Sequence, residues 1–279
     1  MIKRGILIII GLMLLLVLQS STCVIYKEFY NDIKFSSFES TIAIIDSGLT
    51  SSLLNQYDDR IIKTYNAIDN TNDVKDSVGH GSEVFCIIAC NYEISSVEGV
   101  NPTASFIIIK VTNSKNVDIA PLKKAIQYAL EWNPDIINIS ISGDFYDQEI
   151  ENLLNQAYLS NIYVITSVGN QRSSRLFFPS NLSSVISVAS GNSKSKLSSF
   201  TNYSQNVKYI VLGEKILTNN GLNNHQPYYV DGTSYAAAIL TGIISKIHHL
   251  SSFTILHNSI NVYICNRKDL QEFFSNVIN

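Results

Sequence analysis

The sequence predicts an α/β fold in three layers, with a mainly parallel central sheet that carries helices on both faces. Five short apolar runs, rich in β-branched residues, are candidate buried strands: residues 41–45, 106–111, 136–141, 162–167 and 185–189. Helical patterns separate these runs, near residues 82–90, 119–132, 148–159 and 235–249. Short apolar runs that alternate with helices are typical of a parallel sheet buried between two helical layers.

The composition supports this fold and excludes one class of partner. The chain has 279 residues, of which 46% are hydrophobic and 15% charged, and its formal net charge is −3. This composition supplies a large core and no basic face for nucleic acid. No internal repeat or low-complexity linker interrupts the chain, so we predict a single domain over residues 27–279.

The first 26 residues form a separate segment in this prediction. Lys3 and Arg4 precede an apolar stretch at residues 5–18, a pattern that resembles a signal peptide. The stretch is shorter than the ~20 apolar residues of a full membrane span. Its flank at residues 19–26 is only weakly polar, so an uncleaved membrane anchor remains the alternative. Basic residues before the apolar stretch stay in the cytoplasm, so we expect the protein to be secreted or membrane-anchored with its body outside the cell.

Polar residues stand where the first and fourth apolar runs end. Asp46 directly follows the run at 41–45, and Asn170 comes shortly after the run at 162–167. In open parallel sheets, ligands bind beyond the carboxyl ends of the strands, so both side chains are candidates for a site. A turn-forming or helix-capping aspartate is the alternative interpretation of Asp46.

His80 and Ser234 each lie at the beginning of a helical pattern. His80 stands between two glycines, which let other backbone approach the imidazole closely. Ser234 lies in Gly-Thr-Ser-Tyr-Ala-Ala-Ala, where the unpaired N–H groups of a helix N-terminus can bind a developing oxyanion. A capping role is the alternative for each residue.

The order Asp46, His80, Ser234 is that of subtilisin, one of several enzymes that reached a Ser-His-Asp triad independently. Asp-Ser-Gly at 46–48, His-Gly-Ser at 80–82 and Gly-Thr-Ser at 232–234 resemble the three catalytic blocks of the subtilisin-like serine proteases, the subtilases. The resemblance extends over most of the chain after the N-terminal segment. It implies a subtilisin-like three-layer sandwich.

Two further blocks agree with this resemblance. The segment 163–170 resembles the family strand whose closing Gly-Asn supplies the side-chain donor of the oxyanion hole, which assigns that role to Asn170. The segment 135–143 resembles the family strand that pairs with the backbone of a bound peptide and forms one wall of its first specificity pocket. The substrate-binding residues that these two blocks imply are Ile139, Ser140, Ile141, Ser142, Gly143 and Gly169.

The resemblance implies a serine endopeptidase that works through an acyl-enzyme. Ser234 would attack the scissile carbonyl while His80 takes its proton and later returns it to the leaving amine. Asp46 would hold the imidazole in the required tautomer. Asn170 and the backbone N–H of Ser234 would bind the oxyanion.

The chain also departs from the family pattern. Tyr235 to Ala238 replace the usual Met-Ala-Ser-Pro after the nucleophile, and Ser142 stands where a glycine is usual, which narrows the first pocket. Only residues 19–41 separate the apolar stretch from the first catalytic strand, so we expect no folded propeptide. These features favour narrow specificity.

The substrate expected from these departures is a peptide or protein that is cut at one site. Compact subtilases without a propeptide include the leader peptidases of lantibiotic gene clusters, so a lantibiotic precursor is the candidate partner. A general extracellular subtilisin-like protease is the first alternative. A catalytically inactive subtilase fold that only binds is the alternative from another class of function.

The sequence predicts no catalytic metal and no required cofactor, because His-Glu-x-x-His is absent. The loop 69–73 has oxygen ligands at alternate positions but lacks the glycine and glutamate of an EF-hand loop. A solvated acidic loop is favoured there, and structural calcium remains open. Cys86 and Cys90 lie four apart on one helical pattern, too far apart for a relaxed disulfide, so we expect buried free thiols.

Overall fold

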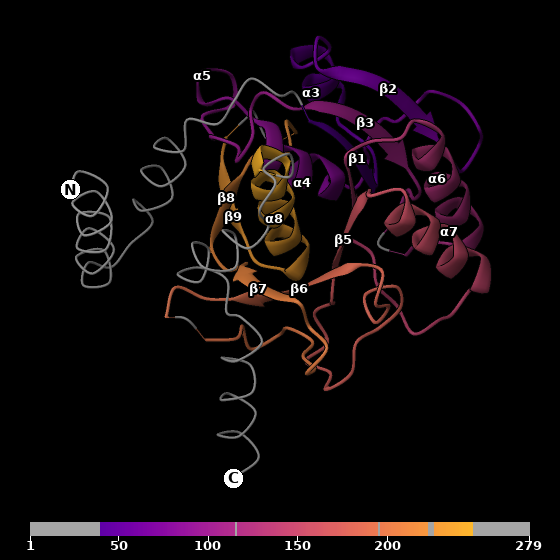
Figure 1. The fold of residues 1–279 in the computed structure, drawn as a ribbon. Helices are drawn as coiled ribbons and strands as arrows, with labels where there is room; N and C mark the ends of the chain where they lie inside the picture. Colours follow the sequence, from indigo (N-terminus) through magenta and orange to yellow (C-terminus); the bar gives the residue numbers. More distant parts are fainter. Residues whose placement is uncertain (1–39, 115, 195, 223–225, 248–279) are drawn as a thin grey trace, which may run out of the picture. The chain divides into compact units, whose positions relative to one another are not determined.

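The computed structural model describes residues 40–247 except 115, 195 and 223–225, and these residues belong to one compact unit (Figure 1). The predicted signal peptide or anchor at residues 1–26 lies outside the described residues, as do 27–39 and 248–279 of the predicted domain. In the described part of the chain, no helix has both the length and the apolar character needed to cross a membrane.

The central sheet has seven strands in the order β2-β3-β1-β4-β5-β6-β7, and every neighbouring pair is parallel. Parallel neighbours require a crossover between them, and helices supply most of these crossovers. The strands are β1 (Thr41–Asp46), β2 (Ile61–Asn66), β3 (Ser105–Lys110), β4 (Ile136–Ile139), β5 (Tyr163–Ser167), β6 (Ile186–Gly191) and β7 (Tyr209–Leu212). A separate antiparallel pair is formed by β8 (Ile216–Thr218) and β9 (Tyr228–Val230).

Helices cover both faces of the sheet, with α6 and α7 on one face and α4 and α8 on the other (Figure 1). The α/β class and the three layers predicted from the sequence are therefore confirmed. The helices are α3 (Ser51–Gln56), α4 (His80–Ala89), α5 (Tyr92–Ser95), α6 (Ile119–Glu131), α7 (Gln148–Leu159) and α8 (Thr233–Ile247).

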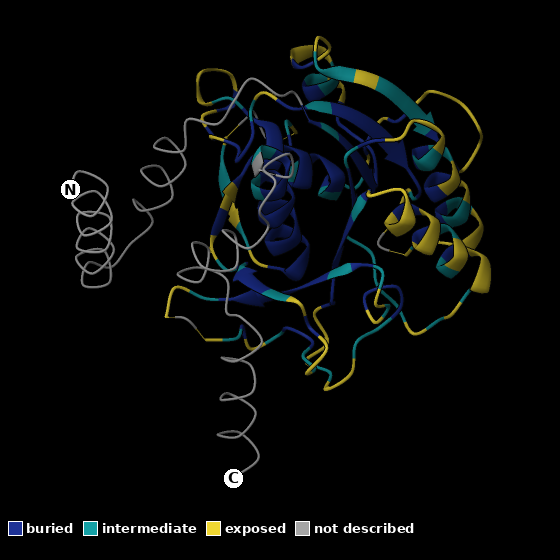
Figure 2. Cartoon of the chain, in the orientation of Figure 1, coloured by how far each residue is buried: buried dark blue, intermediate teal, exposed yellow. Residues whose placement is uncertain are grey.

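The interior strands of the sheet are mostly buried on both faces, as Figure 2 shows in dark blue, whereas the edge strand β2 is mostly half buried. Successive side chains of a strand point to opposite faces, so each strand supplies both layers of core. The layer against α6 and α7 contains an apolar cluster that includes Ala43, Ile45, Ile107, Ile109, Ile137, Ile139, Leu122, Ile126, Ile150 and Leu154. The outward sides of α6 and α7 are exposed and polar, which gives them the amphipathic pattern that the sequence predicted.

The five predicted strands and four predicted helices all exist, with small shifts at their ends. Strand β4 stops at Ile139, two residues before the end of its apolar run, because it lies opposite Ile45 and Thr166, near the ends of β1 and β5. Helix α8 begins at Thr233, so Ser234 lies inside its first turn. The sequence analysis did not predict β2, β7, β8, β9, α3 and α5.

Candidate active site

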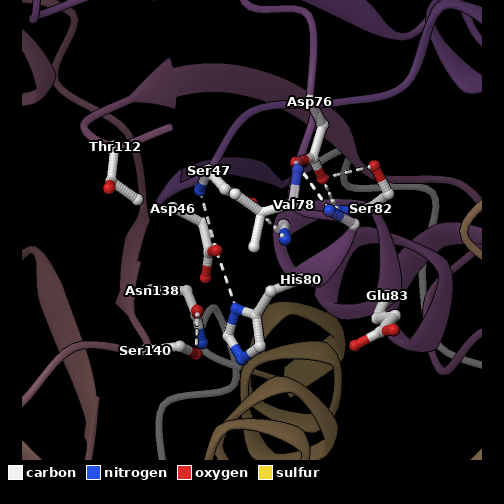
Figure 3. Close-up of polar contacts among 12 residues, drawn as sticks. Asp46, Ser47, Asp76, Val78, His80, Ser82, Glu83, Thr112, Asn138 and Ser140 are labelled. Atoms are coloured by element: carbon white, nitrogen blue, oxygen red, sulfur yellow. Dashed lines mark hydrogen bonds and ion pairs between the residues drawn. The ribbon is translucent and has the colours of Figure 1, made fainter. Parts of the chain in front are cut away.

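The structure brings Asp46 and His80 into direct contact at the carboxyl end of β1 (Figure 3). The Nδ1 atom of His80 lies 2.7 Å from Asp46 Oδ1, which also accepts a hydrogen bond from the Ser47 N–H at 2.8 Å. The other carboxylate oxygen, Oδ2, is buried and has no hydrogen-bond partner among the described residues. Two donors on one oxygen hold the carboxylate in place, and with Nδ1 protonated the Nε2 atom of His80 is left free to act as a base.

Two glycines allow His80 to approach Asp46. Gly79, the residue before α4, has a φ of 94°, a left-handed conformation that glycine adopts without strain. Gly81 packs against the backbone of the loop after β1, where an added Cβ would lie 2.4 Å from the carbonyl oxygen of Gly48. The first turn of α4 therefore rests directly on the end of β1, as the flanking glycines suggested.

Asp76 is a buried carboxylate that organises the loop before His80, and the sequence analysis missed it. Its Oδ1 accepts from the N–H groups of Val78 and Gly79, and its Oδ2 accepts from the N–H and the hydroxyl of Ser82. Burial opposes the charge of Asp76, but these hydrogen bonds outweigh it and hold its pKa below the usual value. An aspartate four residues before a histidine in a loop has no periodicity that would single it out.

Ser234 lies in the first turn of α8 and is 8% exposed. The neighbouring Thr233 ties this helix to the end of β5, because its N–H donates to Asn170 Oδ1 at 3.0 Å and its hydroxyl accepts from the Gly169 N–H at 3.2 Å. The Oδ1 of Asn170 is thereby occupied, while its Nδ2 remains a donor on an exposed residue.

Among the described residues, no hydrogen bond joins the Ser234 hydroxyl to His80 in this structure. Tyr235, the next residue on α8, has its ring centroid 5.7 Å from that of His80. Catalytic hydrogen bonds are often long or poorly aligned without substrate, so this missing hydrogen bond does not exclude Ser234 and His80 as a nucleophile and base pair. The catalytic role of Ser234 remains a prediction.

A cavity of about 370 Å³ opens beside His80. It contains two of the predicted substrate-binding residues, Ser140 and Ile141, together with residues of the loop that follows β3. The residues that line it are Asp46, Ser47, Val78, His80, Glu83, Thr112, Ser114, Val117, Ser140, Ile141 and Tyr235. The end of β1, the beginning of α4 and the extension of β4 therefore face one hollow, as a peptide-binding site requires.

The remaining predicted substrate residues lie along the extension of β4. Ile139 is fully buried as the last residue of the strand, and Gly143 forms a two-bond antiparallel bridge with Phe178. The hydroxyl of Ser142 would lie 2.9 Å from a Cβ placed on Gly169. Ser142 therefore packs against the turn that leads to Asn170, where a glycine would leave more room.

Three carboxylates surround His80 and oppose the effect of its burial. Burial lowers the pKa of the imidazole, but the charge and hydrogen bond of Asp46, with smaller contributions from Glu83 and Asp76, raise it to about 9. A cationic imidazole is therefore stabilised in this site, as required of a base that becomes positively charged during the reaction. No sequence pattern assigned a role to Glu83.

The carboxylates of the predicted acidic loop make local hydrogen bonds. The Oδ1 of Asp69 accepts from the N–H and hydroxyl of Thr71, and the Oδ1 of Asp73 accepts from the Lys75 N–H. These carboxylates cap their own backbone turns. The described part of the chain contains no group of three or more His, Cys, Asp or Glu side chains arranged to hold a metal ion.

The two cysteines of α4 are confirmed as free and buried. Burial raises the pKa of the Cys86 thiol, with a further contribution from the neighbouring Cys90. A thiol that resists ionisation is a poor nucleophile.

Comparison with known proteins identifies a family from sequence and the same fold from structure. Residues 39–255 match the model of the subtilase family. The major intracellular serine protease of Bacillus subtilis is 30% identical over 220 residues, which cover 74% of this chain and 67% of that protein. The thermophilic serine proteinase of Bacillus sp. strain AK1 is 27% identical over 224 residues, which cover 80% of this chain but only 55% of that protein.

Solved structures share the fold at lower sequence identity. A cold-adapted subtilisin-like serine proteinase aligns with a TM-score of 0.66 at 22% identity, covering 76% of each chain. The epidermin leader peptide processing serine protease of Staphylococcus aureus aligns with a TM-score of 0.69 at 21% identity, covering 84% of this chain and 71% of that one. At these identities, the alignments establish the fold.

Proposed function

The chain belongs to the subtilase family, and we propose that it is a serine endopeptidase that uses Ser234, His80 and Asp46 to hydrolyse peptide bonds. The observation that carries this proposal is the 2.7 Å contact between His80 Nδ1 and Asp46 Oδ1. A carboxylate at that nitrogen fixes the tautomer whose Nε2 can accept a proton. A fold that only binds would have no need of this arrangement, so an inactive subtilase is the weaker candidate.

In the proposed mechanism, the Ser234 hydroxyl attacks the scissile carbonyl as its proton passes to His80 Nε2. The imidazolium that forms is stabilised by Asp46, and it returns the proton to the leaving amine. Water then attacks the acyl-enzyme by the same proton route, which regenerates Ser234.

The oxyanion of each tetrahedral intermediate would be bound by two donors near the first turn of α8. One is the Nδ2 of Asn170, whose Oδ1 is held by the Thr233 N–H. The other is the backbone N–H of Ser234, at the positive end of the helix dipole. Donors fixed before the reaction begins lower the barrier without a cost of reorganisation.

The substrate we propose is a precursor peptide that is cut once to release its active part, such as a lantibiotic precursor. Two observations support narrow specificity: Ser142 occupies space against Gly169, and the fold aligns with a protease whose substrate is the epidermin leader peptide. A general extracellular protease is the alternative, and the similarity to bacterial serine proteases supports it.

We further propose that the reaction needs no cofactor, because general acid–base and covalent catalysis by these side chains account for every step. We also propose that the catalytic body acts outside the cell, either secreted or anchored by the N-terminal segment. The charged and apolar pattern of residues 1–18 supports this location. Fractionation of cells that express the full chain tests it, because recovery in the cytosol would contradict the proposal.

The function is tested by mass spectrometry of two substrates incubated with the full chain and with its Ser234→Ala variant. One substrate is a lanthionine-containing precursor peptide and the other is a generic peptide library. A single cut near the leader boundary, absent in the variant and with the library intact, is the expected result. Broad cleavage that depends on Ser234 would establish the general protease instead. Cleavage of neither substrate, with no labelling of Ser234 by a fluorophosphonate, would establish the binding protein.

A further inference from the structure

We propose that Glu83 is a positioning residue of the active site, which clamps the nucleophile helix α8 and strand β9 onto the helix that carries His80. The inference rests on the proposed function, because positioning has meaning only if Ser234 reacts. Glu83 lies three residues after His80 on α4, so both side chains share one face of the helix (Figure 3). Both also line the cavity beside the catalytic pair.

The Glu83 carboxylate accepts hydrogen bonds from two tyrosine hydroxyls that come from different elements. Tyr228 of β9 donates to Oε1 at 2.5 Å, and Tyr235 of α8 donates to Oε2 at 2.6 Å. Hydrogen bonds to an ionised acceptor are shorter and stronger than neutral ones. One side chain of α4 therefore joins two elements, β9 and α8, that lie more than 140 residues further along the chain.

Tyr235 connects the hydrogen bonds of Glu83 to the nucleophile, because it directly follows Ser234 in the chain. Its side chain packs between His80, with ring centroids 5.7 Å apart, and Gly232, where an added Cβ would lie 3.2 Å from the ring. The residue is only 8% exposed, and its hydroxyl points to Glu83. Fixing this ring fixes the backbone of the first turn of α8 and with it the N–H proposed to bind the oxyanion.

The hydrogen bond between Tyr228 and Glu83 also attaches the two-stranded sheet β8–β9 to α4. Tyr228 holds β9 to the Glu83 side chain, and the Thr218 hydroxyl of β8 donates to the Glu83 carbonyl oxygen at 2.9 Å. Both strands of this small sheet are therefore anchored at one residue of α4. The chain between β9 and Ser234 is short, so the anchor also limits how far the nucleophile can move.

Glu83 contributes charge as well as contacts. The groups that face His80 are Asp46 from β1, Asp76 from the preceding loop, Tyr235 from α8 and Glu83 from its own helix. Burial and the charge of Glu83 raise the pKa of Tyr235, so its hydroxyl remains a donor at alkaline pH. Glu83 lies on the same helix as His80, and its charge therefore favours the imidazolium in addition to the charge of Asp46 on β1.

The test measures the rate at which a fluorophosphonate labels Ser234 across pH, because this reaction needs the nucleophile and its base but no natural substrate. The full chain is compared with Glu83→Gln, Tyr235→Phe and Tyr228→Phe. Tyr229→Phe is the matched control, because Tyr229 is the next residue on β9 and is 63% exposed. Thermal unfolding of each variant reports stability separately.

Glu83→Gln keeps the size of the side chain but removes its charge, so we expect two changes. The inflection of the labelling rate should move to lower pH, because the imidazolium loses one stabilising carboxylate. The maximal rate should fall about tenfold, because the first turn of α8 is held less firmly. Tyr235→Phe leaves the charge in place, so it should lower the maximal rate without moving the inflection to lower pH, and Tyr229→Phe should change neither.

Three results would overturn parts of this account, and they are distinguishable. If Glu83→Gln lowers the unfolding temperature but keeps the maximal rate and the inflection of the wild type, Glu83 is structural and the inference fails. If the wild type is labelled at Ser234 in that case, the proposed function stands. If the wild type is not labelled at any pH, both the inference about Glu83 and the proposed function fail. Should Glu83→Gln not fold, the milder Tyr235→Phe decides, because an unchanged maximal rate there would contradict the clamp.

Discussion

The two faces of the central sheet are built differently. The face under α6 and α7 is an apolar cluster with residues such as Ile137 and Leu154 fully buried. The face under α4 and α8 contains buried polar pairs: Asn138 Nδ2 donates to the Thr241 hydroxyl, which in turn donates to the Ala237 carbonyl oxygen. Both distances, 2.8 and 2.9 Å, are those of well-formed hydrogen bonds.

The two faces therefore have different roles: one mainly stabilises the fold, and the other positions the nucleophile helix α8. Apolar contacts are nondirectional, so the α6 and α7 face contributes mainly to the free energy of folding. Buried hydrogen bonds are directional and costly to leave unmade, so they fix the rotation and the height of α8 over the sheet. Since α8 presents Ser234, we expect substitutions on its face to change the reaction rate. Substitutions under α6 and α7 should change stability alone. The following experiments test this contrast in order of the expected effect on rate.

The largest fall in kcat is expected from Asp46→Asn. The amide nitrogen would face His80 Nδ1 and favour the tautomer that leaves no lone pair on Nε2, so kcat should fall about 10⁴-fold. Steady-state kinetics on a peptide substrate measures the fall. The matched control is Asp147→Asn, which changes the cap of α7 on the other face. Asparagine caps helices as well as aspartate does, so its kcat should equal that of the wild type. Equal losses in both variants would contradict the contrast.

A smaller effect is expected from Asn170→Ala, which removes the proposed oxyanion donor. The value of kcat should fall on the order of 10²–10³-fold, with little change in KM, because the donor acts in the transition state. Asn152→Ala, an exposed position on α7, is the control and should have no effect on kcat. If KM rises while kcat is retained, Asn170 binds substrate and is not the oxyanion donor.

Both kcat/KM and stability should depend on pH through the protonation of His80. With the pKa of His80 raised to about 9, the value of kcat/KM should fall about tenfold for each pH unit well below that pKa. The stability contributed by the imidazolium has the opposite sign. It is fully present below about pH 6.5, the pKa of unfolded histidine, and is lost as the pH rises through 9. Urea unfolding of Ser234→Ala across pH measures it without self-digestion. An activity inflection near 6.5 would show that the carboxylates do not hold the imidazolium.

The smallest effect on rate is expected from Leu154→Ala under α7. Removing a fully buried leucine should lower the free energy of unfolding by about 2–5 kcal/mol, which chemical denaturation measures. Below the unfolding temperature, kcat should stay within twofold of the wild type. A large loss of kcat in a folded Leu154→Ala protein would show that the two faces are coupled.

The sequence predicted much of the fold because the buried strands have a local signature. Strands β1, β3, β4, β5 and β6 are central or nearly so, and their burial on both faces makes them continuous apolar runs. Strand β2 lies at the edge of the sheet, and its residues 61–66 are mostly half exposed, so polar side chains dilute the pattern. Strands β7, β8 and β9 have only three or four residues each, too few for periodicity to show.

In the candidate site, the sequence likewise indicated the residues, and the structure showed the contacts between them. Asp46, His80, Ser234 and Asn170 were found because each lies at the end of an apolar run or at the beginning of a helical pattern, within a block that resembles the subtilases. The structure adds the direct contact of the first two and the link from Asn170 to α8 through Thr233. Their roles in catalysis remain predictions for the experiments above.

The sequence by itself determined which segments become strands and helices and which residues are candidates for chemistry, because hydrophobic periodicity and turn residues act over short distances. The tertiary structure alone decided what surrounds those residues. The hydrogen bonds of Glu83 with Tyr228 and Tyr235 join positions 145 and 152 residues apart. Such contacts depend on how helices lie over the sheet, and no local pattern in the chain encodes them.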